Sequence, residues 1–439
     1  MLLLTGGHVV SPPAAPFVGD LLIEGEAIRH AGPGLAAEER ERLVQQGCRV
    51  IDVRGKAILP GFINAHTHAA MSLLRGYAED LPLDRWLEEK VFPVEDRLTP
   101  SDVYWGTMLA IAEMIRGGTT CFADMYFFMD QVARAVDESG MRAVLARGIA
   151  AIGPDGGAKG LAEGEAFCRQ WEGQAGGRIR TRLGPHALYT CPPDFMAKVI
   201  ASSERLGVGL HVHVSESPRE AREHEACYGE SPTETLGRLG CFARPTLAAH
   251  CVHVDERDIE LLAGGGVGVA HCPESNLKLA NGVAPVAAML RAGVRVGIGT
   301  DGPASNNDMD LWEETRLAAI LQKNATGDTT ALAAPLALSL ASSGSADAVG
   351  LGGVAGRLEP GFQADVVVAS LGGAPRRPHM APGNDVVADL LYAGHAADVE
   401  MVVVAGRVLM ENGRLLTLDE EKIVAETREC AVRLGLRRA

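Results

Sequence analysis

Short apolar segments alternate with amphipathic ones over about 300 residues, and this alternation limits the fold more than any other feature of the chain. The amphipathic segments at 102–116, 196–206, 231–239 and 255–263 have helical spacing. The apolar segments have strand length and glycine boundaries: "TTCFADM", "RAVLARG", "RTRLGPHALYT", "GVGLHVHVSES", "TLAAHCVH", "GVGVAHCPES" and "VRVGIGTDG". Strands that alternate with helices form parallel sheets, and so long a series predicts a (β/α)8 TIM-like barrel. An open doubly wound sheet is the alternative, but no GxGxxG follows the first strand.

The two ends of the chain have a different sequence pattern from the region between them. Short alternating strands with glycine-centred turns occur near both termini, as in "GDLLIEGEAIRHAG" and "DVEMVVVAGRVLMENGRLL", and a helix follows the last of them. We therefore expect a small β-sandwich domain built from both termini. Its N-terminal part covers 1–57, the barrel covers 58–360, and the C-terminal part with the terminal helix covers 361–439. A length of 439 residues and a hydrophobic content of 47% suffice for this core.

Two histidines one residue apart end the first barrel strand, in "ILPGFINAHTHAAMSLLRG" at 58–76. Side chains two residues apart on a strand point to the same face, so His66 and His68 should converge on one point. This pair suits a metal ion, although two polar residues at the solvent end of a strand would look the same. The decision between these interpretations depends on further ligands at the same end of the barrel.

Such residues end three later strands. His213 closes "GVGLHVHV" with Glu216 three residues later, His250 closes "TLAAH", and Asp301 closes "VRVGIGTD". Each alone has a simpler explanation, as a hydrogen-bonded rim histidine, a first-turn helix carboxylate or an Asp-Gly turn. Together, at the strand ends where barrels carry their active sites, three histidine nitrogens and one aspartate oxygen predict a catalytic Zn²⁺ or similar divalent ion. Spacing alone leaves open whether His211 or His213 binds it.

With these residues identified, the chain resembles the amidohydrolase superfamily and, within it, the 5-methylthioadenosine/S-adenosylhomocysteine deaminases. The resemblance covers nearly the whole chain and rests on "PGFINAHTHAAMSLLRGYAEDLPLDRWLEEKVFPVE", "GTTCFADMYF", "GPHALYTC", "HVHVSE", "AHCVH", "HCPESNLKLANG" and "GTDGPASNN". It implies that the ligand in "HVHVSE" lies three residues before the glutamate, which is His213. The implied metal ligands are His66, His68, His213 and Asp301.

The implied activity is hydrolytic deamination of the adenine ring by a metal-activated water. In the mechanism that we expect, Asp301 accepts the proton of the attacking water and His250 orients this water by a hydrogen bond. Glu216 protonates N1 and then assists the departing amine, as the non-ligand glutamate does in zinc base deaminases.

The resemblance also implies four further substrate-binding residues. Glu95 would meet the ribose hydroxyls and Trp86 the sugar region, because a carboxylate accepts both O–H donors of a vicinal diol. Arg147 would hold the amino-acid carboxylate of S-adenosylhomocysteine, and His186 would face the purine. Without the resemblance, "DRWLEEK" would be taken for an ordinary exposed helix. Since no second arginine occurs in "GIAAIGPDGG", methylthioadenosine, S-adenosylhomocysteine and adenosine all remain candidate substrates.

Other functions share parts of this pattern. The same centre also serves deaminases or chlorohydrolases of guanine-type, futalosine-type and triazine substrates, and the ribose-directed Glu95 argues against the free heterocycles. A catalytically silent metal-binding protein is the alternative from another class, but metal retention alone needs neither Glu216 nor His250. The donor set admits Zn²⁺, Fe²⁺ or Mn²⁺. A contribution of His211 or His271 to the site stays open.

Charge and cysteine usage restrict the partners. The chain has 41 basic and 56 acidic residues, a net charge of −15 and no Lys/Arg-rich block, so we expect neither nucleic acid nor a membrane as a partner. The nine cysteines are never spaced CxxC, and "MLLLTGGHVVSPP" lacks the features of a signal peptide. We expect a cytoplasmic enzyme that acts on a small nucleoside, and a homo-oligomer is compatible with the sequence.

Overall fold

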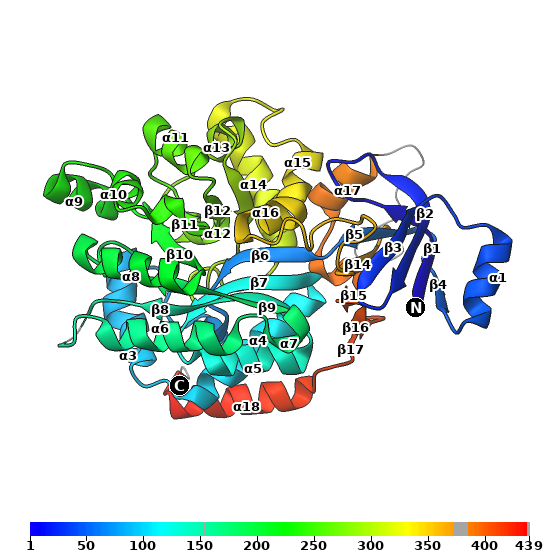
Figure 1. Cartoon of the computed structure of the whole chain (residues 1–439), viewed down its shortest axis with the longest axis horizontal. Helices are drawn as coiled ribbons and strands as arrows, with labels where there is room; N and C mark the ends of the chain where they lie inside the picture. The colour runs from blue at the N-terminus through cyan, green and yellow to red at the C-terminus, as the bar shows by residue number, and fades with distance from the viewer. Residues whose placement is uncertain (153, 373–384, 437–439) are drawn as a thin grey trace.

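The computed structural model describes residues 1–152, 154–372 and 385–436. Figure 1 shows two bodies, a large barrel surrounded by helices and a smaller sheet at its side. Parts of the predicted C-terminal segment, at 373–384 and 437–439, lie outside the described residues. Within the described ranges, no helix has both the length and the apolar composition needed to cross a membrane.

The larger body is an eight-stranded sheet in which every neighbouring pair is parallel. Its strands are β6 (Phe62–Thr67), β7 (Thr119–Tyr126), β8 (Arg142–Ile149), β9 (Ile179–Pro185), β10 (Gly209–Val214), β11 (Thr246–His250), β12 (Gly268–His271) and β13 (Arg295–Ile298). The last strand returns to the first, and the backbone N–H of Asp301 donates to the carbonyl of His66 at 3.0 Å. The predicted (β/α)8 barrel is thereby confirmed.

Helices follow the barrel strands and cover the outside of the sheet (Figure 1). The four segments expected to be helical correspond to α4 (Pro100–Arg116), α8 (Pro193–Leu206), α10 (Pro232–Arg238) and α11 (Glu256–Gly264). Helix α4 begins with a capping box, in which Thr99 and Asp102 each bond the other's backbone N–H, and with a proline at the first helical position. The helices longer than one turn between β6 and β14 are η1 (Ala69–Leu74), α4 (Pro100–Arg116), α5 (Met129–Ser139), α6 (Ala158–Trp171), α8 (Pro193–Leu206), α9 (Pro218–Tyr228), α10 (Pro232–Arg238), α11 (Glu256–Gly264), α12 (Pro273–Lys278), α13 (Val286–Arg291), α14 (Leu311–Thr326), α15 (Ala334–Ser339), η4 (Leu340–Gly344) and α16 (Ser345–Val349).

The short helices of the connection after β6 form one side of the barrel mouth. They are α2 (Leu83–Trp86), the π-helical turn η2 (Leu87–Val91) and α3 (Phe92–Glu95). Elsewhere the chain has short or terminal helices: α1 (Ala37–Gln45), α7 (Gln174–Gly177), η3 (Cys241–Ala243), α17 (Val386–Ala393), η5 (Ala396–Asp398) and α18 (Glu420–Arg433).

The smaller body is a mixed sheet of nine strands from both ends of the chain. Its strands are β1 (Leu2–Val9), β2 (Phe17–Glu24), β3 (Ala27–Gly32), β4 (Arg49–Asp52), β5 (Lys56–Pro60), β14 (Val366–Ser370), β15 (Val399–Val404), β16 (Arg407–Glu411) and β17 (Arg414–Leu415). Strand β5 joins the two halves, since it pairs with β1 on one side and with β14 on the other. Alternate residues of both halves, such as Leu4, Ile23, Val366 and Val403, form one buried apolar cluster. The expected small domain from both termini is confirmed.

Several contacts connect the terminal segments with the barrel. At the start of β8, Arg142 forms a buried ion pair with Asp365, which directly precedes β14. Helix α18 packs along α4 beneath the barrel (Figure 1), where Arg433 pairs with Asp102. The carboxyl ends of the barrel strands remain free of the small sheet, so they are available to build a site.

Candidate active site

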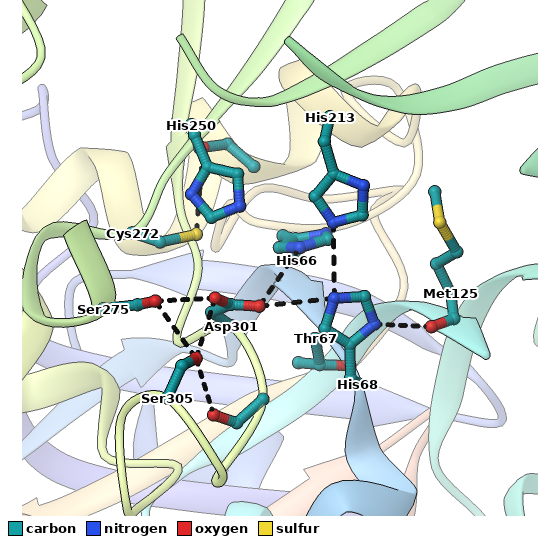
Figure 2. A network of polar contacts seen from close by, with 12 residues as sticks. His66, Thr67, His68, Met125, His213, His250, Cys272, Ser275, Asp301 and Ser305 are labelled. Carbon is teal, nitrogen blue, oxygen red and sulfur yellow. Dashed lines mark hydrogen bonds and ion pairs between the residues drawn. The ribbon is translucent and has the colours of Figure 1, made fainter. Parts of the chain in front are cut away.

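Five residues singled out from the sequence lie together at the carboxyl ends of four barrel strands (Figure 2). His66 belongs to β6, His213 to β10 and His250 ends β11. His68 follows β6 as the residue before η1, and Asp301 follows β13. Register shifts within β6 near Asn64 and Thr67 show that simple strand alternation does not explain this convergence alone. The start of η1 also positions His68.

Four side-chain atoms meet at one point. The Nε2 atoms of His68 and His213 are 3.3 Å apart, and Asp301 Oδ1 lies 3.4 Å from the Nε2 atoms of both His66 and His68. Donor atoms of His66, His68 and His213 all lie within 4.8 Å of one another, as do those of His66, His250 and Asp301. Every member of these groups is buried except His68, which is partly exposed.

Each of the three imidazoles is oriented by a contact at its other nitrogen. His68 Nδ1 lies 2.6 Å from the carbonyl oxygen of Met125, and His213 Nδ1 lies 2.8 Å from that of His186. His66 Nδ1 lies 2.8 Å from His211 Nε2. These contacts leave the three Nε2 atoms for a shared ligand. His211 therefore contacts the far side of the His66 ring and is not part of the cluster.

Asp301 is held from behind by two hydroxyls. Ser275 and Ser305 donate to its Oδ2 at 2.7 and 2.9 Å, so Oδ1 is the oxygen that faces the imidazoles (Figure 2). Burial raises the pKa of this carboxyl, but the His66 contact and the charges of His250 and His68 outweigh it and hold the pKa well below its usual range. Asp301 is consequently a carboxylate.

The cluster fits a divalent metal ion. Burial lowers the pKa of His66 to about 3, and burial with neighbouring imidazoles lowers that of His213 well below its usual value, so both rings are neutral and keep a lone pair. His66 Nε2 is buried and has no hydrogen-bond partner among the described residues. Three imidazole nitrogens and one carboxylate oxygen match the donor set of a catalytic divalent metal.

Glu216 and His250 lie beside this cluster, with Glu216 Oε2 3.9 Å from His250 Nε2. Asn281 donates to Glu216 Oε1 at 3.1 Å, and Asn276 Oδ1 lies 2.9 Å from His250 Nδ1. Burial raises the pKa of Glu216. For His250, burial acts to lower the pKa, but the nearby carboxylates, Glu216 foremost, raise it on balance. A carboxyl and an imidazole with raised pKa values in a buried site suit proton transfer near neutral pH.

Four non-glycine residues at these strand ends have left-handed backbone conformations. The φ angle is 73° at His250, 60° at Asp301, 49° at Ser215 and 47° at Cys251. L-residues adopt this region at a cost, and such strain concentrates at functional sites, where the surrounding structure enforces it.

The cluster lies at the bottom of a cavity of about 860 Å³, near the upper end of the usual range for ligand pockets. The residues predicted to bind substrate all line it: Trp86, Glu95, Arg147, His186 and Glu216. The structure thus brings the predicted site residues to one cavity, except His66, which lies fully buried behind its lining.

Glu95, at the end of α3, and His186, after β9, face the cavity with different local environments. Burial raises the pKa of Glu95, although Tyr126 and His68 act against this shift. Burial lowers the pKa of His186 to about 4, and its Nδ1 lies 2.9 Å from the Thr190 hydroxyl oxygen. Both groups are therefore partly withdrawn from water, as ligand-binding side chains commonly are.

Trp86 and Arg147 have partners of their own. The Trp86 ring is buried, and its Nε1 donates to the carbonyl of Ala78 at 3.2 Å. Arg147 lies over the Phe127 ring, 5.5 Å from its centroid, and donates to Glu163 Oε2 at 2.6 Å. The guanidinium in the cavity wall is consequently already paired with a carboxylate.

Several supporting residues were not predicted from the sequence. Asn276, Asn281 and Ser275 lie in or directly after α12, inside the motif "HCPESNLKLANG". That motif was recognised without roles for these three, and its density of polar residues after a strand was the only signal for them. Glu163 belongs to α6, where nothing local distinguishes it from other exposed helical glutamates.

Comparisons with known proteins agree with this geometry. The model of the amidohydrolase family matches residues 57–409. The chain is 51% identical over 416 residues to the 5-methylthioadenosine/S-adenosylhomocysteine deaminase of Pelotomaculum thermopropionicum, covering 95% of this chain and 94% of that protein.

Two solved structures are similar over nearly their full length. A zinc-bound adenosine deaminase from Xanthomonas campestris superimposes with a TM-score of 0.90 at 37% identity and covers 99% of each chain. The zinc complex of atrazine chlorohydrolase from Arthrobacter aurescens superimposes with a TM-score of 0.88 at 28% identity, covering 98% of this chain and 100% of that one.

Proposed function

This chain belongs to the amidohydrolase family, and from that premise we propose that it deaminates the adenine ring of 5′-methylthioadenosine and S-adenosylhomocysteine, with adenosine as a further substrate. Water replaces the 6-amino group, and the products are the hypoxanthine nucleoside and ammonia. The observation that carries this proposal is the position of Glu216 and His250 over the four-atom cluster, because metal retention alone needs neither residue.

We assign the metal to Zn²⁺, which the two similar structures contain. The residues that hold it are His66, His68, His213 and Asp301. When bound, the ion supplies a water whose pKa is lowered from about 16 toward about 7.

The residues of the chain divide the proton transfers among them. Asp301 accepts the proton of the attacking water at Oδ1, since its Oδ2 is occupied by Ser275 and Ser305. His250, held at Nδ1 by Asn276, orients this water with Nε2 toward C6 of the adenine. Glu216 protonates N1, and burial raises the pKa of its carboxyl, which favours the protonated form that this step needs.

Substrate binding uses the rest of the cavity. Glu95 accepts hydrogen bonds from the ribose hydroxyls, and each bond to a charged group is worth about 1.5–3 kcal/mol. Trp86 packs beside the sugar, and His186 offers Nε2 to the purine because its Nδ1 is engaged by Thr190. Arg147 binds a carboxylate on the 5′ substituent, in competition with Glu163.

The test combines metal analysis with ammonia release. The purified enzyme is stripped of metal, reconstituted with Zn²⁺, Fe²⁺ or Mn²⁺, and assayed with methylthioadenosine, S-adenosylhomocysteine, adenosine, guanine and a chlorotriazine. We expect no activity without metal and turnover only of the adenine nucleosides after reconstitution. Activity confined to free bases or triazines would contradict the nucleoside assignment. Inactivity on every compound would indicate a metal-binding protein without catalytic activity.

A further inference from the structure

We propose that His211 is a positioning residue that holds His66 in the tautomer and orientation required for metal binding. The proposal rests on the metal site of the proposed function and adds a side chain that is not a ligand. His211 lies in β10 two residues before His213, is fully buried, and places its Nε2 2.8 Å from His66 Nδ1.

The three imidazoles of the cluster are not oriented in the same way. Backbone carbonyls, of Met125 and His186, face the Nδ1 atoms of His68 and His213. His66 instead relies on the side chain of His211. Among these three orienting contacts, the one to His66 is therefore the one that a side-chain substitution removes.

The proton positions follow from the contacts. His66 Nε2 is buried, lacks a hydrogen-bond partner in the described chain and lies 3.4 Å from Asp301 Oδ1, so it must keep its lone pair to serve as a ligand. The proton of the neutral ring is then on Nδ1, which donates to His211 Nε2. His211 in turn carries its proton on Nδ1, an atom with no partner within the described chain.

The surroundings of His211 are fixed by the barrel. His211 is fully buried in β10. Arg182 of β9 binds the backbone next to it, because this arginine donates to the carbonyl of Leu210 at 3.1 Å and to that of Val349 at 2.7 Å. The strand that carries His211 is thus held in place.

The contact also crosses the barrel. Strands β6 and β10 are separated by three strands in the sheet, yet the His66 and His211 rings are 4.9 Å apart at their centroids. Strand β10 therefore supplies one ligand, His213, and orients another on the opposite wall. This geometry pre-organises two of the three imidazoles relative to each other before metal arrives.

The experiment measures Zn²⁺ affinity directly, by competition with a chromophoric chelator, in three variants of the full chain. His211→Phe fills the space without an acceptor, and His211→Gln retains an acceptor oxygen. His271→Phe is the matched control. His271 is a similarly buried histidine at the end of β12, separated from β10 by one strand, and neither of its ring nitrogens has a partner within the described chain.

We expect His211→Phe to weaken Zn²⁺ binding about 10- to 100-fold, the usual effect of losing a residue that orients a ligand. His211→Gln should recover most of this loss, and His271→Phe should bind like the parent. The visible spectrum of the Co²⁺-substituted protein should change in His211→Phe alone. The melting temperatures of the metal-free proteins should not rank the variants in the same order as their Zn²⁺ affinities.

Parental affinity in His211→Phe overturns the inference, as does an equal loss in His271→Phe, which would indicate a general packing effect. If His211→Phe does not fold, the smaller His211→Leu replaces it, and equal affinities of the Leu and Gln variants then reject the role. Failure of the parent protein to bind Zn²⁺ would instead reject the metal site of the proposed function.

Discussion

Both ends of the barrel bury charged groups, but the groups that surround these charges differ between the two ends. At the amino end of β8, Arg142 donates to both carboxylate oxygens of Asp365, at 2.7 and 3.2 Å, and the backbone of Ala405 donates to the same carboxylate at 2.7 Å. At the carboxyl end, Asp301 faces several imidazoles, and His66 Nε2 has no hydrogen-bond partner within the described chain.

The difference separates a structural site from a functional one. A buried polar atom without a partner costs about 1–3 kcal/mol, so stability alone does not explain the arrangement at the carboxyl end. The Arg142–Asp365 pair at the amino end finds its partners within the chain and joins the barrel to the small sheet. The carboxyl end is completed by a group that the chain does not contain, which is the physical mark of a binding site.

The largest expected effect is at the carboxyl end. Replacing Glu216 with Gln should lower kcat by about 10²- to 10⁴-fold, because the variant cannot donate a proton to N1. Zn²⁺ content should remain at the parental level, since Glu216 is outside both ligand groups. Ammonia release and metal analysis on the same sample test this, and near-normal turnover would remove Glu216 from the mechanism.

At the amino end, replacing Arg142 with Met should lower the free energy of unfolding by about 3–5 kcal/mol, because Asp365 is left buried without its counterion. The kcat/KM per folded molecule should stay unchanged. Urea denaturation followed by circular dichroism measures the loss, with the double variant Arg142→Met/Asp365→Leu as the control. A double variant as unstable as the single one would show that the unpaired charge is not the cause.

An intermediate effect depends on pH. Burial raises the pKa of Glu220 from 4.5 to about 7, so between these values the folded protein keeps a proton that the unfolded chain releases. The free energy of unfolding should therefore fall as pH rises through this window, by about 3 kcal/mol in total at 1.36 kcal/mol per pKa unit. Glu220→Gln should lose this dependence. Melting temperatures at pH 5 and pH 8 test it, and parallel curves for parent and variant would reject it.

The smallest effect should be on substrate preference. Glu163→Gln removes a half-exposed carboxylate beside Arg147, and such pairs are worth at most about 1 kcal/mol. The KM for S-adenosylhomocysteine should fall up to about five-fold, while methylthioadenosine, which has no charged tail, serves as the internal control. A rise in the KM for S-adenosylhomocysteine alone would instead show that Glu163 contacts the substrate's ammonium group.

Much of the fold and of the site was predictable because the signals are local. Glycine-bounded apolar segments marked the barrel strands, and polar residues at their ends, such as His66, His250 and Asp301, marked the functional edge. Since parallel strands of a barrel present their carboxyl ends on one face, knowledge of the strand ends was enough to bring these residues together. The roles assigned to them remain predictions that the experiments above address.

The sequence by itself thus determined the barrel, the small domain from both termini and the residues that gather at the mouth. The family resemblance implied which of two same-face histidines reaches the metal cluster, but only the tertiary structure placed the other one, His211, in contact with His66. The tertiary structure alone also paired Arg142 with Asp365 and Arg147 with Glu163. The reason is that strand periodicity is set by neighbouring residues, whereas the depth of a side chain in the barrel depends on how strands distant in sequence are staggered.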